Sequence, residues 1–366
     1  MSLSIGIVGL PNVGKSTLFN ALTKNDILAA NYPFATIEPN TGIVPVPDER
    51  LQKLSELYNN APIVPATVTF VDIAGLVAGA SKGEGLGNQF LANIRECAAI
   101  VHIVRAFENN DIVHVHDRIH PEQDIEIINT ELMLADLQTI EKSLPRFEKE
   151  AKANPKARPQ VALLSSLKEL LEAGDIIAIH KLVADLDADT EEAKMLKSLQ
   201  LISTKPVIYV FNLNEEDLSN AEKQENLGSL VAPAESLFVN AQLEAELKDL
   251  PDTDAKELLE SYGQTESGLD KVIRAAQNTL GLQSYLTAGE KEVRAWTIKK
   301  GSTAPQAAGV IHGDFERGFI AAEVVACADL LEAGSLSSAK SVGKVRTEGK
   351  TYIMQPDDVV EFRFNV

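Results

Sequence analysis

The segment Gly9–Ser16 places the tightest constraint on how this chain can fold. It reads Gly-Leu-Pro-Asn-Val-Gly-Lys-Ser, a G-x-x-x-x-G-K-[ST] element, and it stands between an apolar run, Leu3–Val8, and a helical pattern, Thr17–Leu22. A strand, a glycine-rich turn and a helix in this order are typical of a phosphate-binding loop, whose backbone N–H groups point at phosphate oxygens. The flanking strand and helix make a ligand-free glycine turn the less favoured alternative.

The loop residues have distinct expected roles in holding a nucleotide. Lys15 is expected to bridge the β- and γ-phosphates and to neutralise charge during phosphoryl transfer, and the Ser16 hydroxyl is expected to ligate Mg²⁺. The first turn of the following helix adds the positive end of its dipole. The predicted nucleotide-binding residues of this segment are Asn12, Val13, Gly14, Lys15, Ser16 and Thr17.

Length and charge narrow the class of protein. A chain of 366 residues exceeds what one hydrophobic core usually supports, so we expect two or three domains. The net charge of 34 − 53 = −19 argues against a DNA partner or non-specific nucleic-acid binding over the whole surface, but leaves a local basic face open. Two distant cysteines, Cys97 and Cys327, fit a reducing cytoplasm. No apolar stretch reaches membrane-spanning length, so no membrane partner is expected.

The first ~115 residues alternate between strand and helix patterns. Leu3–Val8, Ala66–Val71 and Ala99–Val104 are apolar runs typical of fully buried strands, and Arg50–Tyr58 and Gly87–Cys97 follow a helical period. This alternation predicts an α/β domain with a parallel sheet.

A different pattern begins near Pro121. Asp124–Lys152 and Pro159–Leu201 are rich in Leu, Ala, Glu and Lys with apolar residues at helical spacing, and Asn154–Pro159 separates them. We expect an antiparallel helical hairpin inserted into the sheet domain, with an ordinary surface helix pair as the alternative.

The α/β pattern then returns, and a small α+β module ends the chain. The expected elements are strands Pro206–Phe211 and Ser236–Val239, a helix Gly268–Leu280, strands Val293–Ile298 and Val359–Phe364, and a helix Ala304–Ile311.

Two further positions suit a γ-phosphate sensor. Asp72-Ile73-Ala74-Gly75 follows an apolar strand, so Asp72 is placed to orient Mg²⁺ through water and the Gly75 N–H to approach a γ-phosphate. Thr36, in the loop after the first helix, would ligate Mg²⁺ only when that phosphate is present, which makes an order–disorder switch. A plain turn is the alternative reading of the D-x-x-G element.

These motifs together resemble a known family. Gly9–Thr17, Asp72–Leu76 and Gly79–Phe90 resemble the Obg-related branch of translation-factor P-loop NTPases. Asn212–Glu215, the helical insert and Ala295–Lys299 narrow the resemblance to the YchF (Obg-like ATPase) family, over almost the entire chain.

The resemblance implies both a domain plan and partners. It implies an OBG-type G domain over residues 1–120 and 202–280, a coiled-coil insert over 121–201, and a TGS domain with a ubiquitin-like β-grasp fold over 281–366. It also implies ATP hydrolysis with Mg²⁺ in the cytoplasm, and a monomer that associates with the 70S ribosome or the large subunit and with rRNA.

The base-recognition segment departs from the guanine pattern Asn-Lys-x-Asp. Here it reads Asn212-Leu213-Asn214-Glu215, so Leu213 replaces the lysine whose stem covers the base, and Glu215 replaces the aspartate that accepts two guanine hydrogen bonds. The residues alone predict a site that is not strict for GTP. The resemblance supplies a preference for ATP, with the Leu213 backbone meeting the adenine.

The catalytic water needs an unusual partner. Leu76 stands where Ras-type enzymes place a glutamine, and it cannot hydrogen-bond. The resemblance makes His114 the candidate that orients or deprotonates water, with a solvated loop histidine as the alternative. His102 lies in a buried-strand pattern, so we interpret it as a core residue. Asn12 matches the position that helps bind K⁺ in potassium-activated relatives, which would make K⁺ an activator.

The C-terminal module carries a basic stretch beside alternating aromatic residues. These residues, Lys340, Lys344, Arg346 and Lys350 with Tyr352, Phe362 and Phe364, suit contact with RNA, although solvated lysines and core aromatics are the simpler reading. The sequence therefore favours a nucleotide-switched ribosome-binding ATPase. The alternatives are a GTP-dependent ribosome-assembly GTPase and a metabolic ATPase or kinase with the same phosphate loop.

Overall fold

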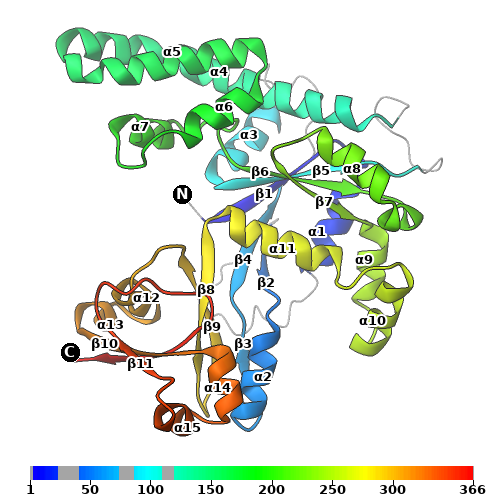
Figure 1. Cartoon of the computed structure of the whole chain (residues 1–366). Helices are drawn as coiled ribbons and strands as arrows, with labels where there is room; N and C mark the ends of the chain where they lie inside the picture. The colour runs from blue at the N-terminus through cyan, green and yellow to red at the C-terminus, as the bar shows by residue number, and fades with distance from the viewer. Residues whose placement is uncertain (1–2, 24–40, 74–85, 109–118, 366) are drawn as a thin grey trace. The chain divides into compact units, whose positions relative to one another are not determined.

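The computed structural model describes residues 3–23, 41–73, 86–108 and 119–365 (Figure 1). The chain divides into two compact units, one of Met1–Gly42 and Thr69–Val272 and the other of Ile43–Val68 and Ile273–Val366. The segment 43–68 groups with the C-terminal unit, which the sequence patterns did not indicate. The domain boundaries implied by the resemblance stay a prediction.

The first unit is built on a sheet whose strand order is β2-β4-β1-β5-β6-β7. Neighbouring strands from β4 to β7 run parallel. Every residue of β1 and β5 is buried, as expected for parallel strands covered on both faces. The predicted α/β parallel sheet is confirmed. The strands are β1 (Ser4–Val8), β2 (Thr41–Pro45), β4 (Thr67–Asp72), β5 (Ala99–Arg105), β6 (Val207–Asn212) and β7 (Glu235–Val239).

Helices follow the strands of this unit, and those that begin at Lys15 and Ala241 start after the carboxyl ends of β1 and β7. The helices are α1 (Lys15–Thr23), α3 (Leu86–Glu96), the 3₁₀ helix η4 (Glu215–Ser219), α8 (Ala221–Ser229), α9 (Ala241–Leu247), α10 (Asp252–Ser261) and α11 (Gly268–Thr279). Asn240 caps α9, since its side chain accepts a hydrogen bond from the Leu243 N–H.

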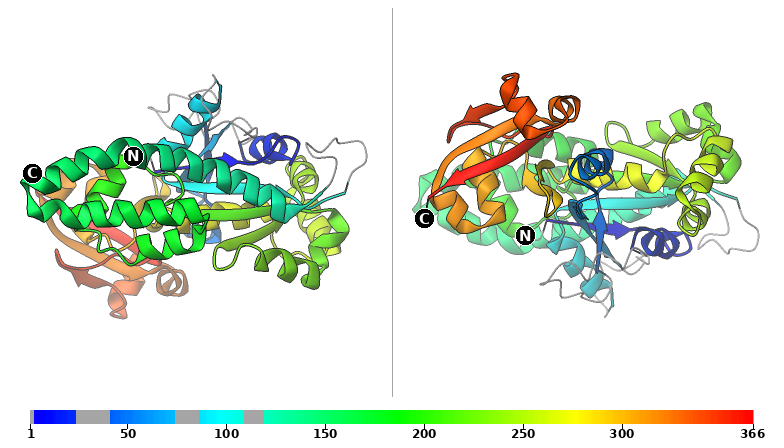
Figure 2. Two further views of the ribbon diagram at one scale, coloured as in Figure 1. Left: turned by 90° about the horizontal axis from the view of Figure 1, so that it is seen from above. Right: turned by 90° about the horizontal axis from the view of Figure 1, so that it is seen from below.

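The region predicted as a helical insert is helical. It contains α4 (Pro121–Ala153), the 3₁₀ helix η3 (Pro155–Ala157), α5 (Arg158–Ala173), α6 (Ile176–Ala184) and α7 (Glu191–Leu199). The long helices α4 and α5 lie side by side (Figures 1 and 2), and Ile140, Phe147, Leu164 and Leu167 share one buried cluster between them.

The returning limb of the insert is broken into three helices rather than one. Gly174 ends α5 with a left-handed backbone, φ 73°, and the Asp175 side chain then caps α6. Glycine is the residue that adopts this conformation without a steric penalty, so Gly174 sets the break between α5 and α6.

Contacts at the end of α3 join the sheet unit to the insert. Arg95 donates hydrogen bonds to the Ala135 carbonyl and the Thr139 hydroxyl of α4, and its guanidinium lies 3.5 Å from the buried Asp136 carboxylate. Asp136 in turn accepts two 2.6 Å hydrogen bonds from Ser203, from its N–H and its hydroxyl. The helix that follows the D-x-x-G segment is therefore fixed to the base of the insert.

The second unit contains a mixed sheet with the order β11-β10-β12-β8-β9-β3, in which β8 and β9 are antiparallel and β3 and β9 are parallel. The predicted α+β character is confirmed, whereas the TGS assignment stays a prediction. Its elements are α2 (Glu49–Leu57), β3 (Ile63–Val64), β8 (Leu282–Ala288), β9 (Val293–Lys299), α12 (Ala304–Ile311), α13 (Gly313–Arg317), β10 (Phe319–Ala326), α14 (Cys327–Ala333), α15 (Leu336–Ser341), β11 (Arg346–Glu348) and β12 (Asp358–Phe364). Within the described ranges, no helix has the length and apolar character that crossing a membrane requires.

Candidate functional site

The phosphate-loop motif forms a tight turn between β1 and α1. Asn12 and Gly14 adopt left-handed conformations, with φ of 62° and 94°. A Cβ at Gly9 would lie 2.7 Å from the Ile103 carbonyl oxygen, and one at Gly14 would overlap the amide nitrogen of Asn212. Both motif glycines are therefore required by close packing, and Asn12 is among the residues that tolerate a positive φ best.

The side chain of Asn212 clamps this loop from the end of β6. Its amide nitrogen donates a 3.0 Å hydrogen bond to the Val13 carbonyl, and its oxygen accepts one of 3.0 Å from the Ala241 N–H. The side chain is buried, so water competes little for these hydrogen bonds. Asn212 thus ties the phosphate loop to the base-recognition strand and to α9.

Lys15 opens α1 and is held in place by backbone and charge. Its Nζ donates a 2.6 Å hydrogen bond to the Ile73 carbonyl and lies 3.9 Å from the Asp72 Oδ1. Burial lowers the pKa of Lys15, and the Asp72 charge offsets part of that shift. An ammonium group with one carbonyl and one distant carboxylate retains donors for phosphate oxygens.

Asp72, at the carboxyl end of β4, fits a role beside a metal ion. Its Oδ1 is buried and has no hydrogen-bond partner among the described residues, and burial raises its pKa while Lys15 lowers it. Such an anionic oxygen is the kind of donor that Mg²⁺ takes, directly or through a bound water. Ser16 is exposed on the first turn of α1. The residues present therefore fit a Mg²⁺ site.

The base-recognition segment has a rigid backbone and a buried leucine. The Leu213 side chain is fully buried in the core. Its N–H donates to the Val239 carbonyl at 2.8 Å, and its carbonyl accepts from the Asn240 side chain at 2.7 Å. The carbonyl therefore keeps a second lone pair. Glu215 accepts a 2.7 Å hydrogen bond from the Tyr262 hydroxyl.

The structure brings together most, but not all, of the predicted site. The phosphate loop, Asp72 and Asn212 converge at the carboxyl ends of neighbouring strands. Thr36, Gly75, Leu76 and His114 lie outside the described residues, and their roles stay predictions.

Comparison with known proteins finds relatives over the full length of the chain. Residues 4–140 match the family described as 50S ribosome-binding GTPase, and residues 282–365 match the YchF-GTPase C-terminal family, described as a protein of unknown function. Curated relatives from Bacillus subtilis (50% identical) and Haemophilus influenzae (51%) are covered over 100% of both chains. Each is named ribosome-binding ATPase YchF. The chain belongs to the YchF family.

Solved structures agree with this membership. The Schizosaccharomyces pombe YchF GTPase superposes with a TM-score of 0.83 at 38% identity, over 99% of this chain and 97% of that one. A GTP-binding protein from Pyrococcus horikoshii gives a TM-score of 0.60 at 22% identity, over 99% and 100%, which supports the fold alone.

Sequence reasoning missed two contributors to this YchF-type site. Asn240 holds the Leu213 carbonyl and caps α9, and its position between a strand and a helix is a readable N-cap signal. Tyr262 reaches Glu215 from 47 residues away, and no local pattern announces that contact.

His102 behaves as predicted. It is 2% exposed, lies beside the Tyr209 ring with centroids 5.2 Å apart, and burial lowers its pKa to about 3. The core interpretation is confirmed.

The C-terminal basic stretch is largely neutralised by acidic neighbours. Lys340 lies 2.6 Å from Glu323 and Lys344 lies 2.9 Å from Asp329, while Arg346 lies 3.7 Å from Asp358. These pairs weaken the argument that the stretch contacts RNA phosphates.

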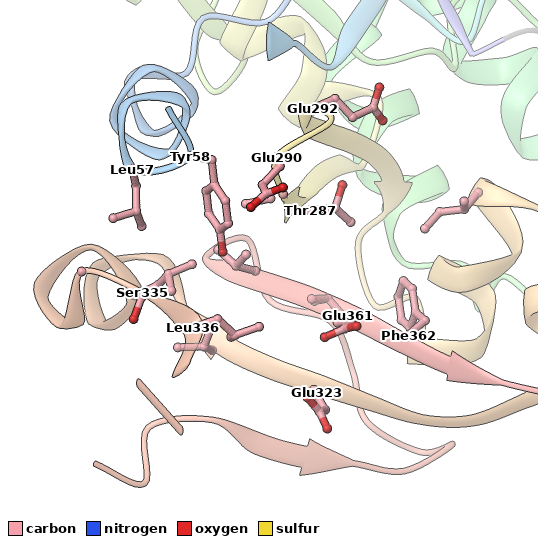
Figure 3. Close-up of a pocket in the computed structure, with 18 of the residues that line it drawn as sticks. Leu57, Tyr58, Thr287, Glu290, Glu292, Glu323, Ser335, Leu336, Glu361 and Phe362 are labelled. Atoms are coloured by element: carbon pink, nitrogen blue, oxygen red, sulfur yellow. The ribbon is translucent and has the colours of Figure 1, made fainter. Parts of the chain in front are cut away.

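The aromatic side chains and a nearby cavity also argue against RNA contact by the C-terminal stretch. Phe362 packs against the core, and Phe364 stacks on Phe315 with ring centroids 3.7 Å apart. A cavity of about 610 Å³ in this unit has four acidic side chains and, among the described residues, no Lys or Arg in its lining, so it offers no cation to a phosphate backbone (Figure 3). The acidic side chains are Glu290, Glu292, Glu323 and Glu361.

Proposed function

We propose that this chain is a ribosome-binding ATPase, which hydrolyses the β–γ anhydride of ATP and uses its nucleotide state as a switch. The observation that carries the proposal is the clamp of Asn212 on Val13, which joins a formed phosphate loop to a base-recognition strand of non-guanine type. The printed names of full-length relatives supply the ribosome partner.

Catalysis in this proposal rests on positioning and charge. Lys15 exchanges its bond to the Ile73 carbonyl for the β- and γ-phosphate oxygens, which it then holds and neutralises. Ser16, Thr36 and Asp72 would hold Mg²⁺, which when bound supplies further charge neutralisation on the phosphates. Gly75 contributes its N–H to the γ-phosphate, and Thr17 follows in the first turn of α1.

ATP is preferred over GTP because of two side chains. The Leu213 side chain lies in the core and covers no base. The Leu213 carbonyl accepts one hydrogen bond from Asn240 and uses its second lone pair to accept from the adenine amino group. Glu215 is one methylene longer than the guanine-reading aspartate and is already bonded to Tyr262. GTP remains a poorer substrate rather than an excluded one.

Two further groups complete the proposed chemistry. His114 orients or deprotonates the attacking water in place of the glutamine that Leu76 replaces, so His114→Ala should lower the ATPase rate and leave ATP affinity intact. Asn12 takes part in binding K⁺ as an activator, so replacing K⁺ with Na⁺ should slow turnover. An unchanged rate in either case removes that assignment.

The output is association with the 70S particle or the large subunit, including rRNA, by a cytoplasmic monomer. The experiment that tests it is cosedimentation with purified ribosomes in the presence of ADP, a non-hydrolysable ATP analogue or no nucleotide, together with ATPase rates with and without ribosomes. We expect binding that differs between nucleotide states. Absence of binding in every state rejects the ribosome partner, and lack of ATP turnover rejects the enzyme.

The same assay separates the alternatives. A GTP-dependent assembly factor would turn over GTP faster than ATP, and a metabolic kinase would require an added acceptor to consume ATP.

A further inference from the structure

The hydroxyl of Tyr262 sits against the base-recognition carboxylate. Tyr262 is the residue that follows α10, and its hydroxyl donates a 2.7 Å hydrogen bond to Glu215 Oε2. The hydrogen bond with Glu215 raises the pKa of Tyr262, so the phenol stays protonated and remains a donor near neutral pH.

Both partners of this bond are held in place. The Tyr262 ring packs against the core cluster that includes Leu213 and Leu218. Glu215 opens η4, directly after the segment that Asn212 and Asn240 fix by their side-chain hydrogen bonds. A packed ring and a fixed backbone hold the two groups at hydrogen-bonding distance, so the bond is supported from both sides.

The bond changes what Glu215 offers to a base. Guanine recognition needs a carboxylate that accepts two parallel hydrogen bonds from the N1–H and the 2-amino group. The bond to Tyr262 fixes the orientation of the Glu215 carboxylate, so the carboxylate does not turn to present both oxygens to that pair. Adenine has a lone pair at N1, so a free carboxylate there would repel it, whereas a carboxylate drawn toward Tyr262 repels it less.

We infer that Tyr262 is a positioning residue that sets the preference for adenine over guanine by engaging Glu215. The inference rests on the proposed nucleotide site and deepens it. Tyr262 itself needs no contact with the nucleotide, and it acts on guanine and adenine in opposite directions.

The test is the affinity of ADP and of GDP for the full chain with Mg²⁺, measured by calorimetry in wild type and in Tyr262→Phe. The variant keeps the packed ring and removes only the hydroxyl. We expect the ratio of the GDP to the ADP dissociation constant to fall by about threefold or more. A role confined to folding would weaken both nucleotides equally and leave the ratio unchanged, which overturns the inference.

Two companion variants show where the effect acts. In a Glu215→Ala background, Tyr262→Phe should leave the ratio unchanged, because its target is gone. Tyr352→Phe removes a tyrosine–carboxylate bond of the same kind, 2.9 Å to Asp358 in the second unit, and should not alter the ratio. A fall in the ratio with either control overturns the inference. Failure of wild type to bind either nucleotide instead rejects the proposed function itself.

Discussion

Single side chains that join distant parts of the chain decide how the candidate site is held. Asn212 is the clearest, since one buried amide serves the phosphate loop and α9 at once. Asn212→Ala leaves the Val13 carbonyl and the Ala241 N–H without their partner. We expect the free energy of unfolding to fall by about 1–3 kcal/mol and ADP affinity to weaken.

Urea unfolding and an ADP titration check this prediction. Asn226→Ala, at an exposed position on α8, is the matched control and should change neither quantity. A variant with wild-type stability and wild-type ADP affinity would show that the clamp contributes nothing.

His102 gives the unfolding equilibrium a specific pH dependence. Its pKa is about 3 in the folded chain against 6.5 for an ordinary histidine, so below pH 6.5 only the unfolded chain takes up this proton. Above pH 6.5, His102 does not make the free energy of unfolding depend on pH. Below pH 6.5, it lowers the free energy of unfolding by about 1.4 kcal/mol per pH unit. At pH 5.0 the loss is about 2 kcal/mol.

His102→Phe removes the titrating group and keeps a ring in the same strand. Denaturant unfolding of both proteins at pH 7.5 and pH 5.0 measures the difference, and the variant should lose less stability on acidification. Equal losses in the two proteins would contradict the assignment.

Residue positions were predictable from the sequence where the pattern is local. The phosphate loop combines a strand, two glycines and a helix within a few residues, so pattern alone located Lys15 and Ser16. The Asn212–Val13 bond spans 199 residues, and the sequence shows no sign of it. The ion pairs of Lys340 and Lys344 were equally invisible, because their partners come from other elements of the second unit.

At the scale of elements, periodicity predicted helices and strands well, but not how a long helical run is divided. The helix Ala304–Ile311 matches α12 at both ends. The run Pro159–Leu201 instead forms α5, α6 and α7, because Gly174 ends α5 and residues 185–190 separate α6 from α7. The sequence pattern also did not indicate that residues 43–68 group with the second unit. The strand that joins them to it, β3, has only two residues, Ile63–Val64, which is too short to form a recognisable pattern.

Gly174 offers a test of that break. A Cβ there would meet no atom within 4 Å, so Gly174→Ala would act only through the left-handed backbone at φ 73°. We expect a loss of about 1 kcal/mol in the free energy of unfolding. Gly289→Ala is the matched control, because it too has no neighbour within 4 Å and lacks a left-handed backbone, and should change stability much less. Equal effects in urea unfolding would show that backbone strain is not the cause.

At the scale of the whole molecule, the distribution of charge indicates which surface meets a ribosome. The net charge of −19 opposes approach to rRNA, so contact needs a local basic region. Residues 142–158, at the junction of α4 and α5, carry six Lys and Arg against two Asp and Glu. Among the described residues, none of these six basic side chains forms an ion pair, in contrast to Lys340 and Lys344.

This contrast predicts that the tip of the insert, rather than the C-terminal unit, makes the main phosphate contacts of the proposed ribosome complex. Lys149, Lys152 and Lys156 are exposed there. Reversing all three to Glu should weaken cosedimentation with ribosomes by about tenfold or more at moderate salt, since each lost phosphate contact also removes counterion release. ATPase activity without ribosomes should stay at the wild-type level.

The matched control reverses three exposed lysines of the C-terminal unit, Lys291, Lys299 and Lys350, in one variant. It carries the same change in net charge, so a general electrostatic effect would weaken both variants alike. We expect the control to bind ribosomes more tightly than the insert variant, and the insert variant to show a shallower dependence of affinity on salt. If the C-terminal variant bound ribosomes more weakly than the insert variant, the main phosphate contacts would lie in the C-terminal unit instead.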